Sequence, residues 1–442
     1  MVNENISAIS TAPGIGGVAI IRISGESPLK IAEKMFVPVK KISVKNFTPY
    51  MMYAGKIICN GFEDFGMCVY FKGPQSFTGE DVVEFHCHGG VQIARGVLKK
   101  TYELGARPAD RGEFTKRAFL NGKLSLSSAE GMIDMINAES MAEVRAGSQL
   151  YQEKLTNAVK SVQNNLTDIL AGIAADIDYP EEGIEETELF DTKQKLQDVL
   201  FELDALIKAY SGGKVIKQGV LVAICGKPNT GKSSLLNALL GYDKAIVSSV
   251  AGTTRDAVEG VLEIDGVKFN LSDTAGIRER AGEIESVGIE KAKKILNSAD
   301  VVIHVYETEN DSFDEEITSS LKDKSVIKVF NKCDKRTPSG DYDIAISAKT
   351  GEGIVKLKQL LAQKSLGGLS LDKAFIIEER HHLALCKAAE SLAQAIGGVG
   401  VFPLDLISLD IKNCWDVLGE ITGETANEEI ISTVFAKFCV GK

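Results

Sequence analysis

A phosphate-binding loop is spelled out at residues 226–233, which read Gly-Lys-Pro-Asn-Thr-Gly-Lys-Ser. In this pattern the glycines let successive backbone N–H groups face one anion, and the helix that follows adds positive potential at its N-terminus. Lys232 is then placed to reach the β- and γ-phosphates, and the Ser233 hydroxyl is placed to bind Mg²⁺. The motif predicts a nucleoside triphosphate site.

Two further motifs predict the parts that sense a γ-phosphate. Thr254, within Gly252–Asp256, is expected to complete the Mg²⁺ coordination and to contact the γ-phosphate through its backbone. Asp273 begins an Asp-Thr-Ala-Gly run, in which Asp273 would hold Mg²⁺ through water and the Gly276 N–H would meet the γ-phosphate. The order and spacing are those of a nucleotide-dependent switch.

The last two motifs select the base. Asn331–Asp334 read Asn-Lys-Cys-Asp, and the Asp334 carboxylate can accept hydrogen bonds from both N1–H and the exocyclic amine of guanine. Adenine offers neither donor, so ATP would leave a desolvated carboxylate without its partners. Ser347-Ala348-Lys349 fits a loop that contacts guanine from the other side. The five motifs together predict a GTP site.

The sequence lacks two of the groups that usually catalyse GTP hydrolysis. Ras-like proteins place a glutamine just after Asp-Thr-Ala-Gly to orient the attacking water, and here that position is Ile277, which cannot. No arginine finger is evident either. The polar run Arg278–Glu285 offers candidates for orienting the water, although such a run is also typical of a solvated surface.

The elements that must position these motifs alternate between strand and helix over residues 214–370. This alternation is typical of a mostly parallel sheet covered on both faces. The expected elements are the strand before the phosphate loop, a hairpin turned at Asp265-Gly266, and two further buried strands: Val220–Cys225, Val261–Ser272, Val301–Val305 and Val326–Phe330.

The segments before and after residues 214–370 show different secondary-structure patterns. Residues 1–120 predict an α+β domain, with strands at Val18–Ile23 and Val82–His86 and a helix over Val91–Leu104. Residues 121–213 show helical periodicity, with Leu196, Leu200, Leu203 and Ile207 on one face and an expected end at Ser211-Gly212-Gly213. Helical character returns from about residue 374 to Lys442. We therefore expect the α/β unit to be inserted into one helical domain.

Composition limits the class of protein. A chain of 442 residues with 44% hydrophobic and 25% charged residues suggests about three globular domains. Its eight cysteines form no Cys-x-x-Cys pair, no apolar run approaches a membrane span, and the first residues do not form a secretory signal, so we expect a cytoplasmic protein. The net charge of −11 argues against general attraction to nucleic acid, yet residues 1–120 carry 15 basic and 11 acidic side chains. An RNA partner would need a local patch, for which this segment is the better candidate, although ordinary scatter explains the excess equally well.

Several longer matches give the chain a family resemblance. It resembles the MnmE (TrmE) family of tRNA modification GTPases through Gly16–Gly25, Ser76–Asp81, Gly112–Leu124 and the C-terminal Phe438–Lys442, which reads Phe-Cys-Val-Gly-Lys. The resemblance implies a folate-binding α+β dimerisation domain, a discontinuous helical domain and an inserted Ras-like P-loop G domain. The corresponding boundaries are 1–120 for the first domain, 121–213 and 371–442 for the helical domain, and 214–370 for the G domain.

The resemblance also implies an activity and its partners. The family forms homodimers through the N-terminal domain and a heterotetramer with the flavoprotein MnmG, which uses FAD and NADH. Together they place an aminomethyl or carboxymethylaminomethyl group on C5 of the wobble uridine (U34) of certain tRNAs. The one-carbon unit comes from a tetrahydrofolate, either the 5-formyl or the 5,10-methylene derivative.

The family motifs assign roles to particular residues of this chain. The G domains of the family pair across the dimer, and K⁺ would bind at the pairing surface, where an arginine finger would lie. The ion would be held by Asn229, Ser248, Val250 and Thr253, and its positive charge would serve the same purpose as the finger. Glu285 would orient the attacking water, beside Thr254 and Gly276. The remaining expected contacts to GTP are Thr230, Gly231, Lys232, Ser233, Ser234, Asp273, Asn331, Lys332, Asp334, Ser347, Ala348 and Lys349.

The expected folate ligands are Arg22, Glu84, Lys123 and Lys442. A pterin presents a pair of N–H groups to Glu84 much as guanine does to Asp334, and the glutamate tail of the folate presents carboxylates to a basic side chain. Cys439 is the candidate for chemistry at the one-carbon unit, and a buried hydrophobic cysteine is the alternative. A metal at His86, Cys87 and His88 is disfavoured because no fourth ligand lies nearby.

Two other functions are consistent with part of the sequence. An Era-like regulatory GTPase of ribosome assembly would share the G domain, but it would lack the N-terminal motifs and the Cys-Val-Gly-Lys tail. A folate-sensing scaffold without catalysis would not need Thr254, Asp273 and Glu285, all of which are present.

Overall fold

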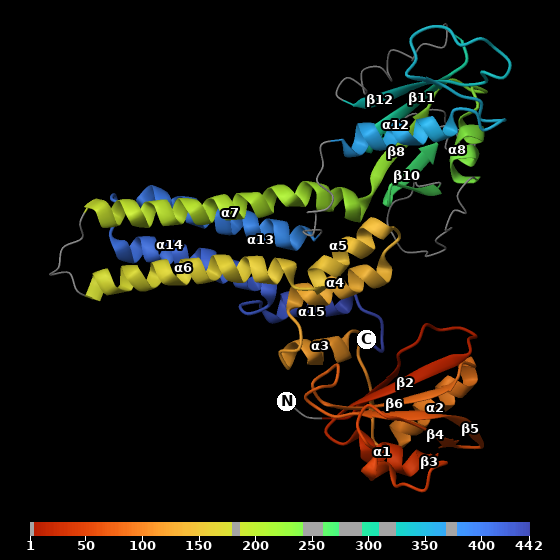
Figure 1. Ribbon diagram of the computed structural model, residues 1–442, viewed down its shortest axis with the longest axis vertical. Helices are drawn as coiled ribbons and strands as arrows, with labels where there is room; N and C mark the ends of the chain where they lie inside the picture. Colours follow the sequence, from red (N-terminus) through yellow and green to blue (C-terminus); the bar gives the residue numbers. More distant parts are fainter. Residues whose placement is uncertain (1–3, 179–185, 242–259, 274–293, 309–323, 368–377) are drawn as a thin grey trace. The chain divides into compact units, whose positions relative to one another are not determined.

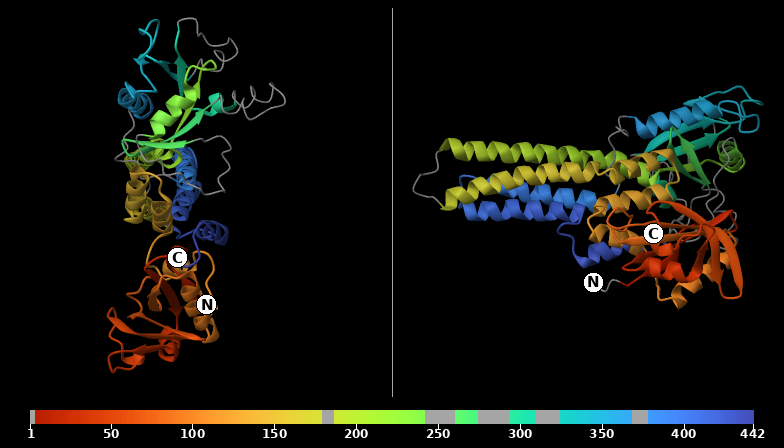
Figure 2. Two further views of the ribbon diagram at one scale, coloured as in Figure 1. Left: turned by 90° about the vertical axis from the view of Figure 1, so that its right-hand side faces the viewer. Right: turned by 60° about the horizontal axis from the view of Figure 1, so that its bottom comes forward.

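The structure is a computed structural model of the 442-residue chain (Figures 1 and 2). It describes residues 4–178, 186–241, 260–273, 294–308, 324–367 and 378–442. The chain divides into two compact units, described separately below. The first contains Met1–Ile133, Gln149–Phe201 and Ala384–Lys442, and the second contains Asp134–Ser148 and Glu202–Leu383.

A seven-stranded sheet forms the N-terminal part of the first unit, in the order β3-β4-β5-β6-β2-β1-β7. All neighbouring strands are antiparallel except β1 and β7. Its strands are β1 (Ile6–Ile9), β2 (Val18–Gly25), β3 (Phe36–Pro38), β4 (Met52–Cys59), β5 (Phe62–Phe71), β6 (Asp81–His88) and β7 (Arg107–Pro108). The strands and helix predicted for this segment are confirmed, as is its mixed α and β class.

The two faces of this sheet differ because side chains alternate along each strand. One face packs in a single core with helices α1 (Pro28–Met35) and α2 (Val91–Glu103), around buried residues such as Ile21, Phe85 and Val97. The opposite face carries Arg22 and Glu84, which are directly paired between β2 and β6. A polar pair at the centre of a strand is therefore explained by its position on the face that α1 and α2 leave open.

Four long helices make up much of the helical part of the first unit and lie side by side in Figures 1 and 2. They are α6 (Lys154–Asp178), α7 (Glu186–Gln218) up to Phe201, α13 (Glu379–Gly398) from Ala384, and α14 (Leu404–Thr422). Gln163 of α6 donates a hydrogen bond to the backbone oxygen of Trp415 in α14 (3.2 Å). Leu196 and Leu203 are fully buried, as their helical spacing predicts.

The end predicted for α7 was wrong. The helix does not stop at Ser211-Gly212-Gly213 but continues to Gln218. Each glycine inside a helix costs about 1 kcal/mol relative to alanine. Here Gly212 and Gly213 are buried, and the last turn buries Ile216 and carries the ion pairs of Lys217, so tertiary packing offsets the local preference.

The second unit is built on a six-stranded sheet in the order β13-β12-β11-β8-β10-β9, parallel except for the β9–β10 hairpin. Its strands are β8 (Val220–Cys225), β9 (Gly260–Ile264), β10 (Val267–Asp273), β11 (Val301–Tyr306), β12 (Ser325–Phe330) and β13 (Ile344–Ala345). The predicted hairpin and buried strands are confirmed. Helices α8 (Lys232–Gly241) and α12 (Ile354–Leu366) share the main core with the sheet.

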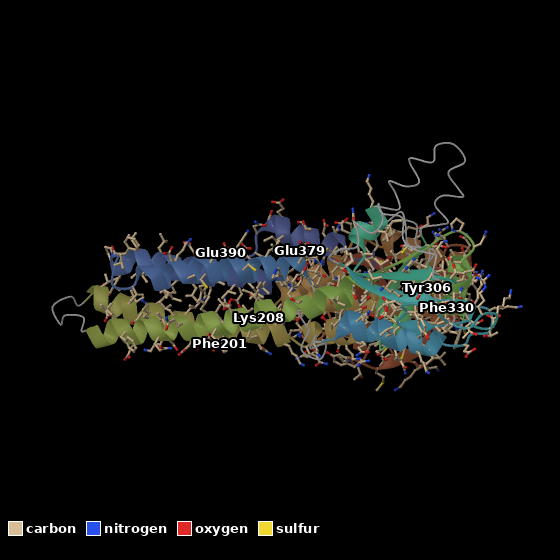
Figure 3. All side chains as sticks on the ribbon, turned by 90° about the horizontal axis from the view of Figure 1, so that it is seen from above. Phe201, Lys208, Tyr306, Phe330, Glu379 and Glu390 are labelled. Carbon is tan, nitrogen blue, oxygen red and sulfur yellow. The ribbon has the colours of Figure 1, made fainter. Side chains whose placement is uncertain are left out.

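Aromatic rings close the carboxyl ends of β11 and β12. Tyr306 and Phe330, labelled in Figure 3, meet edge to face with their centroids 5.7 Å apart, and the Tyr306 hydroxyl donates to the Asp341 backbone oxygen (2.8 Å). This contact joins the carboxyl end of β12, which Asn331–Asp334 follow directly, to the carboxyl end of β11.

A short helical segment belongs to the same unit as this sheet. In α5 (Met141–Tyr151), Ala142 donates its N–H to the Gly266 oxygen at the hairpin turn (2.9 Å). Lys268 of β10 lies 3.1 Å from Glu139 and 3.1 Å from Glu143.

No helix among the described residues is long and apolar enough to cross a membrane.

The remaining helices of the first unit are α3 (Glu113–Leu120), α4 (Leu126–Asn137) as far as Ile133, and α15 (Glu428–Ala436). Phe435 and Phe438 pack with Leu126 and Ala129 in one buried cluster. The C-terminal residues then run beside the start of α3, since Arg111 and Val440 form an isolated antiparallel bridge.

Candidate functional site

The phosphate loop joins the central strand β8 to helix α8, as the sequence predicts. Gly226 has a φ of +148°, and a Cβ added there would lie 2.1 Å from the Val305 oxygen, so only glycine fits. The loop is closed by its own side chains: Thr230 donates to the Lys227 oxygen at 2.9 Å, and Lys232 donates to the same oxygen at 2.7 Å. Lys232 is thus already directed back over the loop in which phosphates would lie.

Two oxygen donors converge at the start of α8. Ser233 Oγ donates to Asp273 Oδ2 at 2.9 Å, and Asp273 is buried at the end of β10. A hydroxyl and a carboxylate are the ligand types that Mg²⁺ prefers, and it commonly keeps several waters. Two of the three side chains predicted to hold Mg²⁺, Ser233 and Asp273, are therefore adjacent and chemically suited to the ion, while the third, Thr254, lies outside the described residues.

A cavity of about 510 Å³ lies beside the loop. Every residue predicted to contact the base lines it, together with two from the loop and α8: Asn331, Lys332, Asp334, Ser347, Ala348, Lys349, Gly231 and Ser234. Ser347 Oγ donates to Asp334 Oδ1 at 2.7 Å, and this hydrogen bond is the main cause that lowers the pKa of Asp334. The carboxylate is thereby kept ionised and oriented, ready to accept two hydrogen bonds.

Asn331 joins the two halves of this site. Its side-chain amide donates to the Thr230 oxygen at 2.8 Å, and its side-chain oxygen accepts from the Ala348 N–H at 3.1 Å. Asn331 is 1% exposed, so both contacts are shielded from water. One buried side chain thus ties the phosphate loop to the last base-contacting loop.

Some contributors were missed by the sequence analysis. Asn237, Ala238 and Lys335 also line the cavity, although no motif marked them. Glu307, to which no motif assigned a role, lies 2.5 Å from the Lys332 ammonium, and that ammonium also donates to the Asn229 oxygen at 2.7 Å. The place of Glu307 directly after β11 was the only available signal.

A second group of predicted residues meets on the open face of the N-terminal sheet. Arg22 Nε donates to Glu84 Oε1 at 2.7 Å, and His86 Nε2 lies 3.3 Å from Glu84 Oε2. Burial acts to raise the pKa of Glu84, but the hydrogen bond from His86 and the charge of Arg22 outweigh it, so the pKa is lowered. The Arg22 guanidinium also lies 5.5 Å from the Phe77 ring centroid and 5.7 Å from that of Phe114.

The other predicted folate ligands are less closely joined to this pair. Lys123 is exposed and donates to the Pro74 oxygen at 2.9 Å, in the loop that also carries Phe77. The C-terminal tail lies against the end of β1, because Gly441 has a φ of +99° and a Cβ added there would lie 2.1 Å from the Ile9 oxygen. Lys442 is half-buried beside it. Arg22 and Glu84 are therefore brought together, while no described contact joins Lys123 or Lys442 to them.

Cys439 is exposed, which differs from the alternative of a buried structural cysteine. The neighbouring Phe438 is 1% exposed and anchors the tail instead. His86 is engaged with Glu84 and His88 with Asp64 (2.6 Å), and the described residues contain no group of three or more possible metal-ligating side chains.

Comparison with models of protein families shows which family the chain belongs to. A model described as "GTP-binding protein TrmE N-terminus" matches residues 5–123, and one described as "MnmE helical domain" matches residues 126–439. The chain belongs to the MnmE family. Three proteins named "tRNA modification GTPase MnmE" are similar over their full length and the full length of this chain. They are 36% identical in Clostridioides difficile (strain 630), 35% in Natranaerobius thermophilus and 37% in Desulforamulus reducens (strain MI-1).

Part of the chain is also similar in sequence to solved structures. The G domain of the T. maritima FeoB iron transporter is 30% identical, covering 33% of this chain and 98% of that one, with a TM-score of 0.25. The cytosolic domain of the same transporter in a GDP form is 22% identical, covers 46% of this chain, and has a TM-score of 0.26. The sequence likeness to MnmE proteins, in contrast, spans all parts of the chain.

Several predicted residues of the MnmE site lie outside the described residues. They are Ser248, Val250, Thr253, Thr254, Gly276 and Glu285, together with Ile277. Asn229 is described, and it has a φ of +66°, in the left-handed region that asparagine tolerates better than most residues. The structure thus describes the phosphate loop and the cavity beside it. The roles of the predicted switch residues and of the water-orienting Glu285 stay predictions.

Proposed function

We propose that this MnmE-family GTPase modifies C5 of the wobble uridine of tRNA, together with the flavoprotein MnmG and its FAD and NADH. The observation that carries the proposal is the cavity lined by every residue predicted to contact guanine, with Asp334 held by Ser347, in a chain similar to tRNA modification GTPases over its full length. The proposal includes the division into an N-terminal domain, a discontinuous helical domain and an inserted G domain, and a cytoplasmic location.

We propose that hydrolysis needs Mg²⁺ and is stimulated by K⁺. The Ser233–Asp273 pair supplies the oxygen donors suited to Mg²⁺. Asn229 lies in the phosphate loop, and its backbone oxygen is held by Lys332, which leaves its side-chain amide oxygen as the group to bind a monovalent cation. K⁺ there would supply positive charge as the phosphates become more negative in the transition state.

We propose that a one-carbon tetrahydrofolate binds on the open face of the N-terminal sheet. Glu84, kept ionised by His86 and Arg22, can accept hydrogen bonds from the pterin, and Phe77 and Phe114 offer apolar surfaces beside Arg22. Lys123 and Lys442 would bind the carboxylates of the tail. Cys439, which is exposed, is the group that we assign to chemistry at the one-carbon unit.

We also propose that the chain forms a homodimer through this domain. The open face carries Met52, Phe65 and Met67, which are 49%, 57% and 46% exposed. Met67 is paired with His86 between β5 and β6, so the apolar surface continues into the folate site. A second copy of the chain would cover this surface and complete the site.

The test has a cellular and a biochemical part. Mass spectrometry of tRNA from a strain without this protein should show wobble uridines without the C5 group, and their unchanged modification would exclude the proposed substrate. In vitro, GTP hydrolysis should rise strongly when K⁺ replaces Na⁺, and Asn229→Ala should remove the difference while binding of GTP remains. Equal rates in the two salts for the wild type would exclude the cation mechanism.

A further inference from the structure

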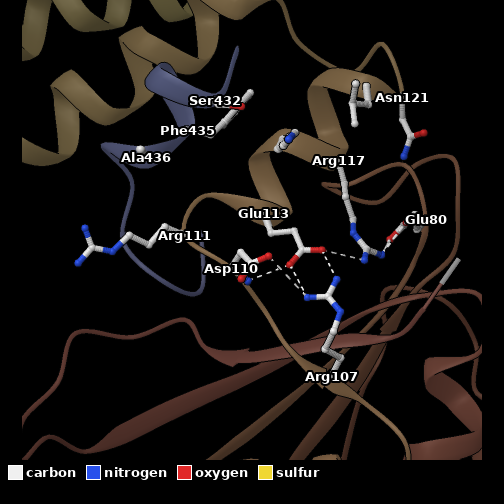
Figure 4. A pocket seen from close by; sticks show the side chains of 12 residues that line it. Glu80, Arg107, Asp110, Arg111, Glu113, Arg117, Asn121, Ser432, Phe435 and Ala436 are labelled. Carbon is white, nitrogen blue, oxygen red and sulfur yellow. Dashed lines mark hydrogen bonds and ion pairs between the residues drawn. The ribbon is translucent and has the colours of Figure 1, made fainter. Parts of the chain in front are cut away.

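A second cavity, of about 500 Å³, lies within the first unit and is drawn in Figure 4. Four basic side chains line it (Arg107, Arg111, Lys116 and Arg117), together with residues of α15. Neither Arg22 nor Glu84 lines it. Glu113, Lys116 and Arg117 occupy the face of α3 that lines the cavity, while Phe114 is fully buried on another face and packs toward Ile6 and Ala8 of the sheet.

One side of this cavity is formed by ion-paired side chains that hold one another in position. Arg107 donates to both carboxylate oxygens of Glu113, at 3.0 and 2.6 Å, and Arg117 donates to Glu113 at 3.0 Å and to Glu80 at 3.0 Å (Figure 4). Burial acts to raise the pKa of Glu113, but the bonds from Arg107, Asp110 N–H and Arg117 outweigh it and lower the pKa. The three carboxylates of the cavity, Glu80, Asp110 and Glu113, are therefore all paired with Arg107 or Arg117, and the cavity as a whole carries one more positive than negative side chain.

Arg111 and Lys116 are the two remaining cations of the cavity. Neither forms an ion pair with any residue of the described ranges, and no dashed line reaches Arg111 in Figure 4. Arg111 is exposed and Lys116 is half-buried. Since Glu80, Asp110 and Glu113 face Arg107 and Arg117, the surplus positive charge of the cavity lies on Arg111 and Lys116.

The position of Arg111 links this charge to the C-terminal tail. Arg111 pairs with Val440 in an isolated bridge, and the Gly112 N–H donates to the Cys439 oxygen at 3.4 Å. The exposed Cys439 is therefore one residue away from the partner of Arg111. A polyanion bound by Arg111 would pass beside the cysteine to which we assign one-carbon chemistry.

We propose that this cavity binds the phosphodiester backbone of the substrate tRNA. The proposal rests on the proposed function, since it takes tRNA as the substrate. An RNA strand presents one phosphate per nucleotide in succession, which suits two cations that have no ion pair with another described residue. The contacts go to the backbone, so they would position the RNA near Cys439 without reading its sequence.

Binding of an unmodified tRNA transcript with a wobble uridine to the full-length chain tests the proposal, measured by fluorescence anisotropy across a series of KCl concentrations. Arg111→Gln and Lys116→Gln should each weaken binding by about three- to tenfold at low salt and reduce the slope of log K against log salt by about one. Lys99→Gln removes an exposed lysine of α2 and is the matched control, expected to behave as the wild type. Affinity for GTP should be unchanged in all three variants.

Further arms separate the alternatives. Arg111→Lys and Lys116→Arg keep the charge and should retain most of the affinity, which a folding defect would not allow. If the glutamine variants lose affinity for a pentaglutamyl folate but bind tRNA normally, the cavity serves a folate tail and the proposal is overturned. Normal tRNA binding by both glutamine variants overturns the cavity assignment alone. A wild-type chain that binds no tRNA at any salt concentration overturns the proposed substrate as well.

Discussion

Asp334 lies in the nucleotide cavity with its carboxylate fixed by Ser347, which is itself completely buried. The Ser347 hydroxyl also accepts a hydrogen bond from the Thr350 N–H at 3.2 Å, so the donor to Asp334 is held in place by its own loop. Such an arrangement orients a carboxylate before the base arrives, and the specificity for guanine then rests on a prearranged acceptor.

Replacing this carboxylate by an amide should change the base that is bound. In Asp334→Asn the amide N–H₂ would face the N–H donors of guanine, so the affinity for GTP should fall by about 100-fold or more. Xanthine carries an acceptor in place of the exocyclic amine of guanine, so xanthosine triphosphate should bind the variant better than it binds the wild type. Competition with a fluorescent nucleotide gives both affinities. Lys335→Gln, a change at the next residue of the same cavity, is the control and should keep the preference for GTP.

The residues that bind nucleotide directly were predictable, because their chemistry demands particular side chains at particular spacings. Lys232, Ser233 and Asp334 carried such a signal. The residues that hold them did not: Glu307 beside Lys332 and His86 beside Glu84 act through contacts between strands that are distant in sequence. A carboxylate or an imidazole suits many neighbours, so only the fold reveals which neighbour it has.

At the scale of secondary-structure elements, the last turn of α7 leads directly into β8 and the phosphate loop. Lys217 in this turn forms ion pairs with Asp134 of α4 and with Glu378, which precedes α13. Burial acts to lower the pKa of Lys217, but the charges of Asp134 and Glu378 outweigh it and raise the pKa. The Lys217 ammonium thus connects the segment just before the G domain, at the end of α7, to the segment just after it, at Glu378.

Lys217→Met should destabilise the protein by about 2 kcal/mol, less than for a fully buried pair because 36% of the lysine side chain is exposed. The raised pKa means that the stabilisation is fully present below the usual lysine pKa of 10.5 and is lost as the pH rises through the higher folded value. Unfolding in guanidinium chloride at pH 7 and at pH 11 should therefore show a larger difference between variant and wild type at pH 7.

The control for this measurement is Lys214→Met, one turn earlier on the same helix. Lys214 is exposed and has no ion pair among the described residues, so its loss should cost less than 0.5 kcal/mol or so. If the two variants are equally stable at pH 7, the ion pairs of Lys217 do not stabilise the fold.

This junction also explains why the end of α7 could not be predicted. Two adjacent glycines are a reliable signal for a helix end when a segment is judged by its local preferences. Here the helix is extended by contacts made at Ile216 and Lys217 with segments that lie far away in the sequence. In contrast, the turn at Asp265-Gly266 was predictable, because both residues adopt positive φ (+51° and +82°) and the turn is complete in itself.

At the scale of the whole molecule, the proposed chemistry needs two copies of the chain. The proposed K⁺ site lies where another G domain would pair, and the open face of the N-terminal sheet is the surface assigned to dimerisation. The register places Met67 opposite Ala54 and Phe65 opposite Lys56, so these exposed side chains share one face. If dimerisation through this face brings the G domains together, a change there should alter GTP hydrolysis without touching the nucleotide.

Met67→Glu tests this connection by adding a charge to the apolar face. Burying an unpaired carboxylate in an interface is costly, so we expect the variant to be a monomer where the wild type is a dimer, as measured by sedimentation or light scattering. The K⁺-stimulated rate should fall with the dimer, while GTP affinity stays unchanged because Asp334 and Lys232 are unaffected. Phe201→Glu makes the same kind of change at a residue of α7 that is 76% exposed (Figure 3), and it should leave the dimer intact. A Met67→Glu variant that remains a dimer would place the interface on another surface, and a monomeric variant with full K⁺ stimulation would show that G-domain pairing does not depend on this face.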